Sequence, residues 1–130
     1  RGGRVLRAEK KTSYYKDNYI DYDPSKIYKI KAKVRQLLPA ANGEQECSIA
    51  VETAGGQSYD IINPQQLTTA EDWQLIEGYL SGSSSNIEFD VTVLPGTGQI
   101  RPVIRLNSDS GDGIAEIDYL KIEELQVNNQ

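Results

Sequence analysis

Residues 27–35 read IYKIKAKVR, and apolar and basic side chains alternate through this whole stretch. The apolar residues from Tyr28 to Val34 fall on one side of an extended chain, and three lysines and Arg35 fall on the other. A period of two is typical of a β-strand with one buried and one solvated face. The stretch therefore predicts a strand that turns Tyr28 into the core.

The same alternation recurs along the chain on both sides of this strand. It predicts strands at residues 46–52, 73–80, 86–94, 100–107 and over most of 113–125, with others in 4–8, 13–20 and 58–62. In residues 86–94 the expected inward positions are Ile87, Phe89, Val91 and Val93. Only residues 63–72, NPQQLTTAED, suggest a turn or two of helix.

Turn chemistry separates these strands. Gly, Ser, Asn, Asp and Pro gather in ANGE, AGGQ, SGSSSN, PGTGQ and NSDSGDG, which begin at residues 41, 54, 81, 95 and 107. The last resembles a calcium loop at first sight, but it lacks regular acidic spacing and is interpreted as a hairpin loop. Short strands between such turns predict one all-β domain over residues 1–130, an antiparallel β-sandwich (jelly roll) of two packed sheets.

Composition argues against several partners. The 130 residues contain 14 Lys and Arg against 19 Asp and Glu, a net charge of −5. Nucleic-acid binding needs a positive field, so no nucleic-acid partner is expected. No apolar run is as long as a membrane span, so membrane insertion is not expected either.

The residues also argue against an enzyme. The chain has no His, which removes the usual general base and the usual transition-metal ligand. Glu88 and Asp90 share one strand face, but alternating carboxylates are ordinary solvated surface. The single Cys47 alternates with Ile49 and Val51, which predicts a small core residue. A binding or structural role is therefore expected.

Three motifs in order carry a resemblance to a known superfamily. They are the strand from Tyr28 to Arg35, the segment WQLIEGYL at residues 73–80, and IDYLKI at residues 117–122. This order resembles carbohydrate-binding modules with a galactose-binding-like jelly roll, of families four, nine, sixteen and twenty-two. The segment YIDYDPSKIYKIKAKVR, residues 19–35, is also similar to segments of phage tail and fibre proteins and of secreted polysaccharide-acting proteins.

The resemblance implies a structural calcium ion near Asp118. Period two places Asp118 on the same strand face as Leu120 and Ile122, where an unpaired charge is costly. In these modules the Asp of the closing I-D helps to bind calcium together with N-terminal groups, yet the usual N-terminal ligand segment is not recognisable in RGGRVLRAEKK. The alternative is an Asp bonded to backbone amides or to a basic side chain.

The resemblance also implies binding of a polysaccharide or a surface glycan. Sugar modules stack aromatic rings on sugar faces and bond the hydroxyls with amides, Arg and carboxylates. Their sites lie on a concave sheet or on loops at its edge. The expected ligand-binding residues are Tyr59, Tyr79, Gln74, Gln57, Arg35 and Tyr15, while Trp73 is expected mainly to pack.

A structural role is the competing hypothesis. Jelly rolls of this kind also build phage tails and extracellular filaments, with self-assembly or neighbouring subunits as partners. In such an assembly a first strand missing here would be supplied by a neighbour. Either hypothesis implies an extracellular or virion-surface protein.

Overall fold

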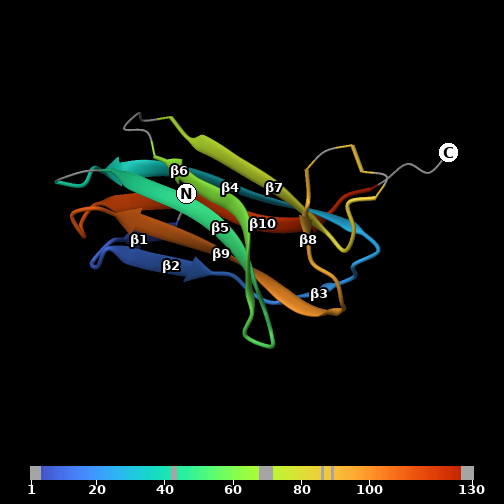
Figure 1. The fold of residues 1–130 in the computed structure, drawn as a ribbon. Helices are drawn as coiled ribbons and strands as arrows, with labels where there is room; N and C mark the ends of the chain where they lie inside the picture. Colours follow the sequence, from blue (N-terminus) through green and yellow to red (C-terminus); the bar gives the residue numbers. More distant parts are fainter. Residues whose placement is uncertain (1–3, 42–43, 68–71, 86, 89, 127–130) are drawn as a thin grey trace.

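The computed structural model describes residues 4–41, 44–67, 72–85, 87–88 and 90–126. These residues form two packed sheets (Figure 1). The strands are β1 (Arg4–Arg7), β2 (Thr12–Lys16), β3 (Ile20–Tyr22), β4 (Ile27–Leu38), β5 (Gln45–Thr53), β6 (Ser58–Gln66), β7 (Gln74–Ser81), β8 (Thr92–Val93), β9 (Gly98–Ser108) and β10 (Ile114–Glu124). No helix among the described residues is long and apolar enough to cross a membrane.

The two sheets divide the strands evenly. The first sheet has the order β1-β10-β4-β7-β8, and the second has the order β2-β9-β5-β6, with β3 also paired to β9. Neighbouring strands are antiparallel, except that β7 and β8 are parallel. This arrangement confirms the predicted all-β sandwich.

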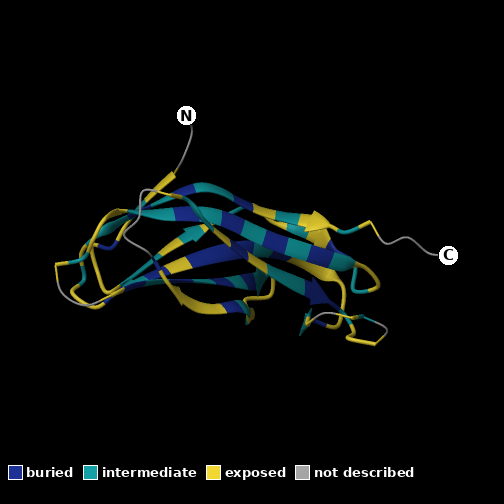
Figure 2. Ribbon diagram, turned by 90° about the horizontal axis from the view of Figure 1, so that it is seen from above, coloured by how far each residue is buried: buried dark blue, intermediate teal, exposed yellow. Residues whose placement is uncertain are grey.

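The core lies between the sheets and follows the predicted alternation. Figure 2 shows buried residues alternating with partly buried ones along the central strands, while exposed residues gather in the loops. Tyr28 and Cys47 are both buried, as the sequence predicts. Burial also raises the pKa of the Cys47 thiol to about 12, because a thiolate would be poorly solvated there.

Pro102 lies in the middle of β9, although proline cannot donate to a sheet ladder. Its carbonyl accepts a hydrogen bond from Asp17 N at 3.1 Å, on the side of β2 and β3. In a strand, the N–H and the C=O of one residue point to the same side. The N–H that Pro102 lacks would therefore point toward the segment between Lys16, where β2 ends, and Ile20, where β3 begins. Proline therefore removes no ladder bond here.

A β-bulge in β10 places Asp118 differently from the prediction. Ile117 pairs with Val34 and Tyr119 pairs with Lys33, so Asp118 is an extra residue without a partner on β4. The bulge changes the phase of the strand, because Ile117 and Leu120 are both buried. The expectation that Asp118 continues the apolar row of Leu120 is wrong.

Three other predictions about secondary structure are wrong. Among the described residues of 86–94, β8 is the one strand; Val93 is exposed and Leu94 is buried, because adjacent apolar residues fit either phase. Asn86 and Phe89 lie outside the described residues. Residues 63–66 continue β6, so no helix begins there, and residues 68–71 of the expected helical turn lie outside the described residues. Residues 109–113 connect β9 to β10 in different sheets, so they do not form a hairpin.

Candidate functional site

One end of the sandwich carries a cavity of about 260 Å³, which we call the end cleft. Two glycine-containing loops border it, residues 53–57 between β5 and β6 and residues 94–99 before and at the start of β9. Gly96 and Gly98 have φ angles of 90° and 145°, which glycine adopts without the steric cost of a Cβ. The lining comprises Tyr22, Thr53, Ala54, Gly55, Gln57, Tyr59, Leu94, Pro95, Gly96, Thr97, Gly98, Gln99 and Ile100.

Tyr59 and Gln57 meet in this cleft, as two members of the predicted site. Tyr59 pairs with Val51, so its half-buried ring packs against the core, and its hydroxyl lies 3.3 Å from Gln57 Oε1. The turn itself is fixed by bonds from Gln57 N to Thr53 Oγ1 at 3.1 Å and from Thr53 N to Gln57 O at 2.8 Å. A ring edge and an amide are therefore held beside each other on a rigid turn.

The opposite wall of the cleft is formed by Tyr22 and Leu94. Tyr22 Oη donates to Leu94 O at 2.7 Å, and burial raises the pKa of Tyr22 to about 12. The phenol is therefore a neutral donor at physiological pH. Gln99 adds a second amide, which donates to Asp21 Oδ1 at 3.2 Å.

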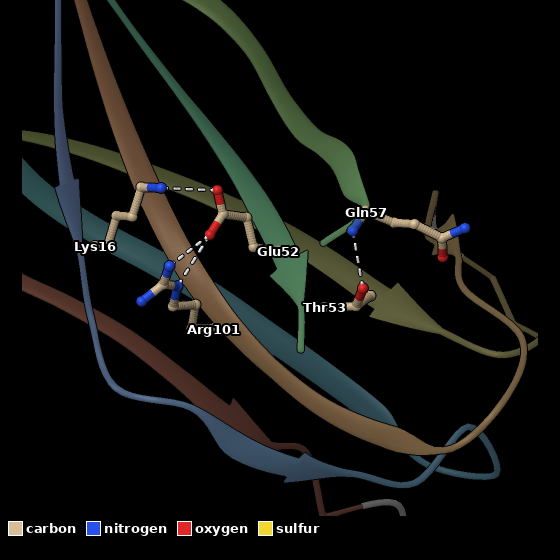
Figure 3. A network of polar contacts seen from close by, with 5 residues as sticks. All are labelled: Lys16, Glu52, Thr53, Gln57 and Arg101. Carbon is tan, nitrogen blue, oxygen red and sulfur yellow. Dashed lines mark hydrogen bonds and ion pairs between the residues drawn. The ribbon is translucent and has the colours of Figure 1, made fainter. Parts of the chain in front are cut away.

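In the part of the chain that the structure describes, no Lys, Arg, Asp or Glu lines the end cleft. The adjacent charges lie on the outer face of the second sheet, where Glu52 accepts from Lys16 Nζ at 3.0 Å and from Arg101 Nη2 at 2.8 Å. Figure 3 shows this network and the Gln57 side chain, which points away from it. Lys16 and then Arg101 hold the pKa of Glu52 below its ordinary value. This network carries two positive charges and one negative charge, and none of its three residues is among the described residues that line the cleft.

Arg35 and Tyr79, also predicted for the site, lie on the outer face of the first sheet. The Arg35 guanidinium bonds Glu116 at 2.7 Å and lies 4.4 Å from the ring centre of Trp73. Tyr79 pairs with Lys29, six residues from Arg35 along β4, a separation of ~20 Å in a strand. The two side chains therefore cannot hold one sugar ring between them.

Gln74 and Tyr15 are separate from both places. Gln74 begins β7 and donates to Gln66 O at 3.3 Å. Tyr15 pairs with Ile104 and packs against the core, while the neighbouring Tyr14 is 56% exposed. The six expected ligand-binding residues thus occupy several parts of the molecule, and only Gln57 and Tyr59 line the end cleft.

The surroundings of Asp118 bear on the calcium expectation. Calcium takes several oxygen ligands, yet the residues that pair with the neighbours of Asp118 include the basic Arg4 and Lys33. Among the described residues, no three Asp, Glu, His or Cys side chains group closely enough to hold a metal ion. The described residues therefore do not supply a carboxylate-rich calcium site around Asp118, and calcium binding stays a prediction.

Sequence reasoning did not single out Thr53, Tyr22 and Gln99 as members of one site. A local signal existed, because AGGQ and PGTGQ both place a glutamine directly after a glycine turn. Which turns meet is decided by the pairing of β5 with β9, which puts Thr53 opposite Ile100. That pairing joins strands that are far apart in the sequence, so it cannot be read from the turn sequences.

Comparison with known proteins extends the description. No protein-family model and no curated protein matches the chain. The C-terminal domain of EclA, described as a sugar-binding protein, matches with a TM-score of 0.58 over 95% of this chain and 79% of that domain, at 17% identity. The fold is carbohydrate-binding-module-like.

Two further structures agree on the fold. The CBM22-1 xylan-binding domain of Xyn10C from Paenibacillus barcinonensis matches with a TM-score of 0.53 over 98% of this chain and 84% of its own, at 13% identity. The enzymatically active domain of tailspike protein 4 from bacteriophage CBA120 matches with a TM-score of 0.58 at 10% identity. The match covers 93% of this chain but only 15% of the tailspike chain. At such identities the likeness concerns the fold, and function must be argued from the site.

Proposed function

We propose that this chain is a non-catalytic carbohydrate-binding module that binds a neutral glycan in the end cleft. The observation that carries the proposal is the composition of the cleft, whose described lining residues combine the Tyr59 ring, two glutamine amides and threonine hydroxyls with no charged side chain. The apolar face of a sugar ring packs on an aromatic ring, and amides and hydroxyls bond its hydroxyl groups.

The same composition argues against catalysis in the cleft. Glycoside hydrolysis uses a pair of carboxyl groups that flank the scissile bond, and neither Asp nor Glu is among the described residues that line the cleft. Two of the structures compared above are described as sugar-binding or xylan-binding domains, which supports a binding role. The proposal therefore assigns recognition, and not turnover, to this end of the sandwich.

Isothermal titration calorimetry against soluble xylan, glucan, mannan and galactan, and against an acidic polysaccharide, tests the proposal. We expect saturable binding of a neutral glycan that Gln57→Ala weakens and Tyr59→Ala abolishes. Because the Tyr59 ring also packs on the core, circular dichroism must show that each variant is folded. Tyr79→Ala is the matched control on the first sheet and should bind like the wild type. Loss of binding in Tyr79→Ala with normal binding in Gln57→Ala would move the site to the first sheet.

An extracellular or virion-surface location follows from the proposed partner, since polysaccharides and surface glycans are met there. The structural alternative is a subunit of a phage tail or filament, and the likeness to the tailspike protein does not favour it, because at 10% identity that likeness concerns the fold alone. Self-assembly therefore remains the second hypothesis. Sedimentation of the protein would favour it if the chain associated in the absence of any glycan.

Calcium near Asp118 is a proposal that rests on the family resemblance. Calcium bound to the folded chain alone should raise the melting temperature. We expect a rise with calcium chloride that a chelator reverses and that Asp118→Asn removes. An unchanged melting temperature on addition of calcium or chelator would favour the alternative, an Asp satisfied by protein groups.

A further inference from the structure

A second hollow lies beside the end cleft and has no role in the proposal above. We call it the serine hollow. It has about 440 Å³ and is lined by the turn before β4, by the loop after β7 and by the end of β10. Its polar side chains include Lys26, Glu124, Ser83 and Ser85, and Ile87 and Leu125 add apolar surface.

The cleft and the hollow share one wall. Tyr22 and Leu94 line the end cleft, and Ser81 lines the serine hollow. Two hydrogen bonds cross the wall, from Tyr22 Oη to Leu94 O at 2.7 Å and from Leu94 N to Ser81 O at 2.8 Å. The two depressions are therefore neighbours on the same end of the sandwich, separated by a single hydrogen-bonded layer.

The wall and the floor of the hollow are built from fixed backbone. Gly82 N donates to Pro24 O at 2.9 Å, and a Cβ on Gly82 would lie 2.4 Å from Pro24 Cβ. The turn below is fixed as well, because Ser25 N donates to Asp23 Oδ1 at 2.9 Å. Such close backbone contact explains why glycine is needed at this point, and it gives the hollow a defined shape.

The polar groups of the hollow suit a molecule rich in hydroxyl groups. Lys26 Nζ and Glu124 Oε1 are 3.2 Å apart, and their side chains are 46% and 38% exposed. Such a pair offers a donor and an acceptor side by side, which matches two neighbouring hydroxyls of a sugar. Ser83 Oγ accepts from Ser85 N, so its own proton can bond a further oxygen. No Tyr, Trp or Phe is among the described residues that line the hollow, so these residues do not provide a stacking surface like that of the end cleft.

We infer that the serine hollow is a second subsite for the same glycan, which takes sugar units beyond the unit held in the end cleft. The module then binds an oligosaccharide chain across the end of the sandwich and not a single sugar. The inference rests on the proposed function. Because its ion pair is open to solvent, the hollow adds little affinity by itself and contributes mainly when the cleft is occupied, so its contribution depends on chain length.

Chain-length dependence of binding tests this inference. The probes are β-1,4-linked oligosaccharides of xylose, glucose, mannose and galactose, from the disaccharide to the hexasaccharide, measured by calorimetry. We expect affinity to rise with length, and Ser83→Trp, which fills the hollow, to weaken the hexasaccharide about tenfold and the disaccharide less than about twofold. Ser84→Trp is the matched control, because Ser84 is exposed but does not line the hollow.

A variant with less change in volume supplies a second measurement. Lys26→Met removes the donor of the ion pair and should also weaken only the longer chains, whereas Lys10→Met at the other end of the sandwich should have no effect. Equal affinities for all lengths, or equal effects of Ser83→Trp and Ser84→Trp, would overturn the subsite while binding through Tyr59 stood. Absence of binding by every oligosaccharide would overturn the proposed function and the subsite with it.

Discussion

At the scale of single residues, Gly78 shows how closely the two sheets approach. A Cβ at this position of β7 would lie 2.9 Å from Ile61 Cγ2 and 2.9 Å from Ile62 Cγ1 on β6. Real Cβ atoms do not make such contacts, so both isoleucines or the backbone would have to move. Glycine is therefore favoured here by packing between β7 and β6 of the two sheets and not by a turn.

We expect Gly78→Ala to lower the free energy of unfolding by about 1–3 kcal/mol, the usual cost of overpacking. Urea denaturation followed by tryptophan fluorescence measures it. Gly55→Ala is the control, because its Cβ would lie 3.8 Å from the nearest heavy atom, Thr53 Oγ1, an ordinary contact. Equal stability of the two variants would show that β6 and β7 are further apart than described.

Asp118 shows where a sequence period of two fails to predict which face of a strand a residue occupies. The alternation that begins at Leu120 is real, but it is shifted by one residue from the alternation that ends at Ile117. A bulge has no reliable local sequence signal, so a pattern carried across it assigns the wrong face. The buried positions of Tyr28 and Cys47 were predictable because the strands that contain them keep one phase around these residues.

At the scale of elements, Glu52 connects three strands of the second sheet. It lies on β5 and accepts bonds from Lys16 on β2 and Arg101 on β9 (Figure 3). Its pKa is lowered, mainly by Lys16 and then by Arg101, so the folded state binds a proton less readily than the unfolded state. The network therefore stabilises the fold at neutral pH, and this contribution is lost as the pH falls through the lowered pKa.

Glu52→Gln should cost at most about 1 kcal/mol at neutral pH, as is usual for solvent-accessible ion pairs. The difference from the wild type should shrink as the solution is acidified below the ordinary pKa of a glutamate. Thermal unfolding across that pH range checks this, with Glu88→Gln as the control for an exposed carboxylate. A difference that grew in acid would contradict the assigned sign.

The strands were predicted correctly where one face is buried and the other is solvated, and the prediction failed at the edge of the first sheet. The long inner strands β4, β5, β9 and β10 were found from alternation. The predicted strand at residues 86–94 was longer than the observed edge strand β8, in which Thr92 and Val93 pair with β7. Alternation in the sequence does not show which of these residues pair. Edge pairing depends on what the neighbouring strand offers, which the local sequence does not contain.

At the scale of the whole molecule, the candidate site illustrates the same limit. Gln57 and Tyr59 were predicted from their residue types, an amide and an aromatic ring, and the fold brings them to Gln99 and Tyr22 from distant segments. Arg35 and Tyr79 were predicted by the same reasoning about residue types, and the fold places them on another face. Residue types indicate sugar chemistry, but only the topology decides which of them meet.

Charge distribution over the whole molecule gives a further prediction. The chain has a net charge of −5, yet none of the described residues that line the end cleft is charged. Affinity for a neutral glycan should therefore change little between low and high salt. Calorimetry in the two buffers measures it. A steep loss of affinity with salt would point to the basic residues of β4 and to an acidic glycan.

The location of the glycan tests the central claim most directly. Backbone amide shifts in ¹H–¹⁵N spectra, recorded during titration with the neutral oligosaccharide that binds, map the site residue by residue. We predict that the shifts concentrate in residues 53–59 and 94–100, around the end cleft. Shifts concentrated in residues 29–35 and 75–79, on the outer face of the first sheet, would contradict the account.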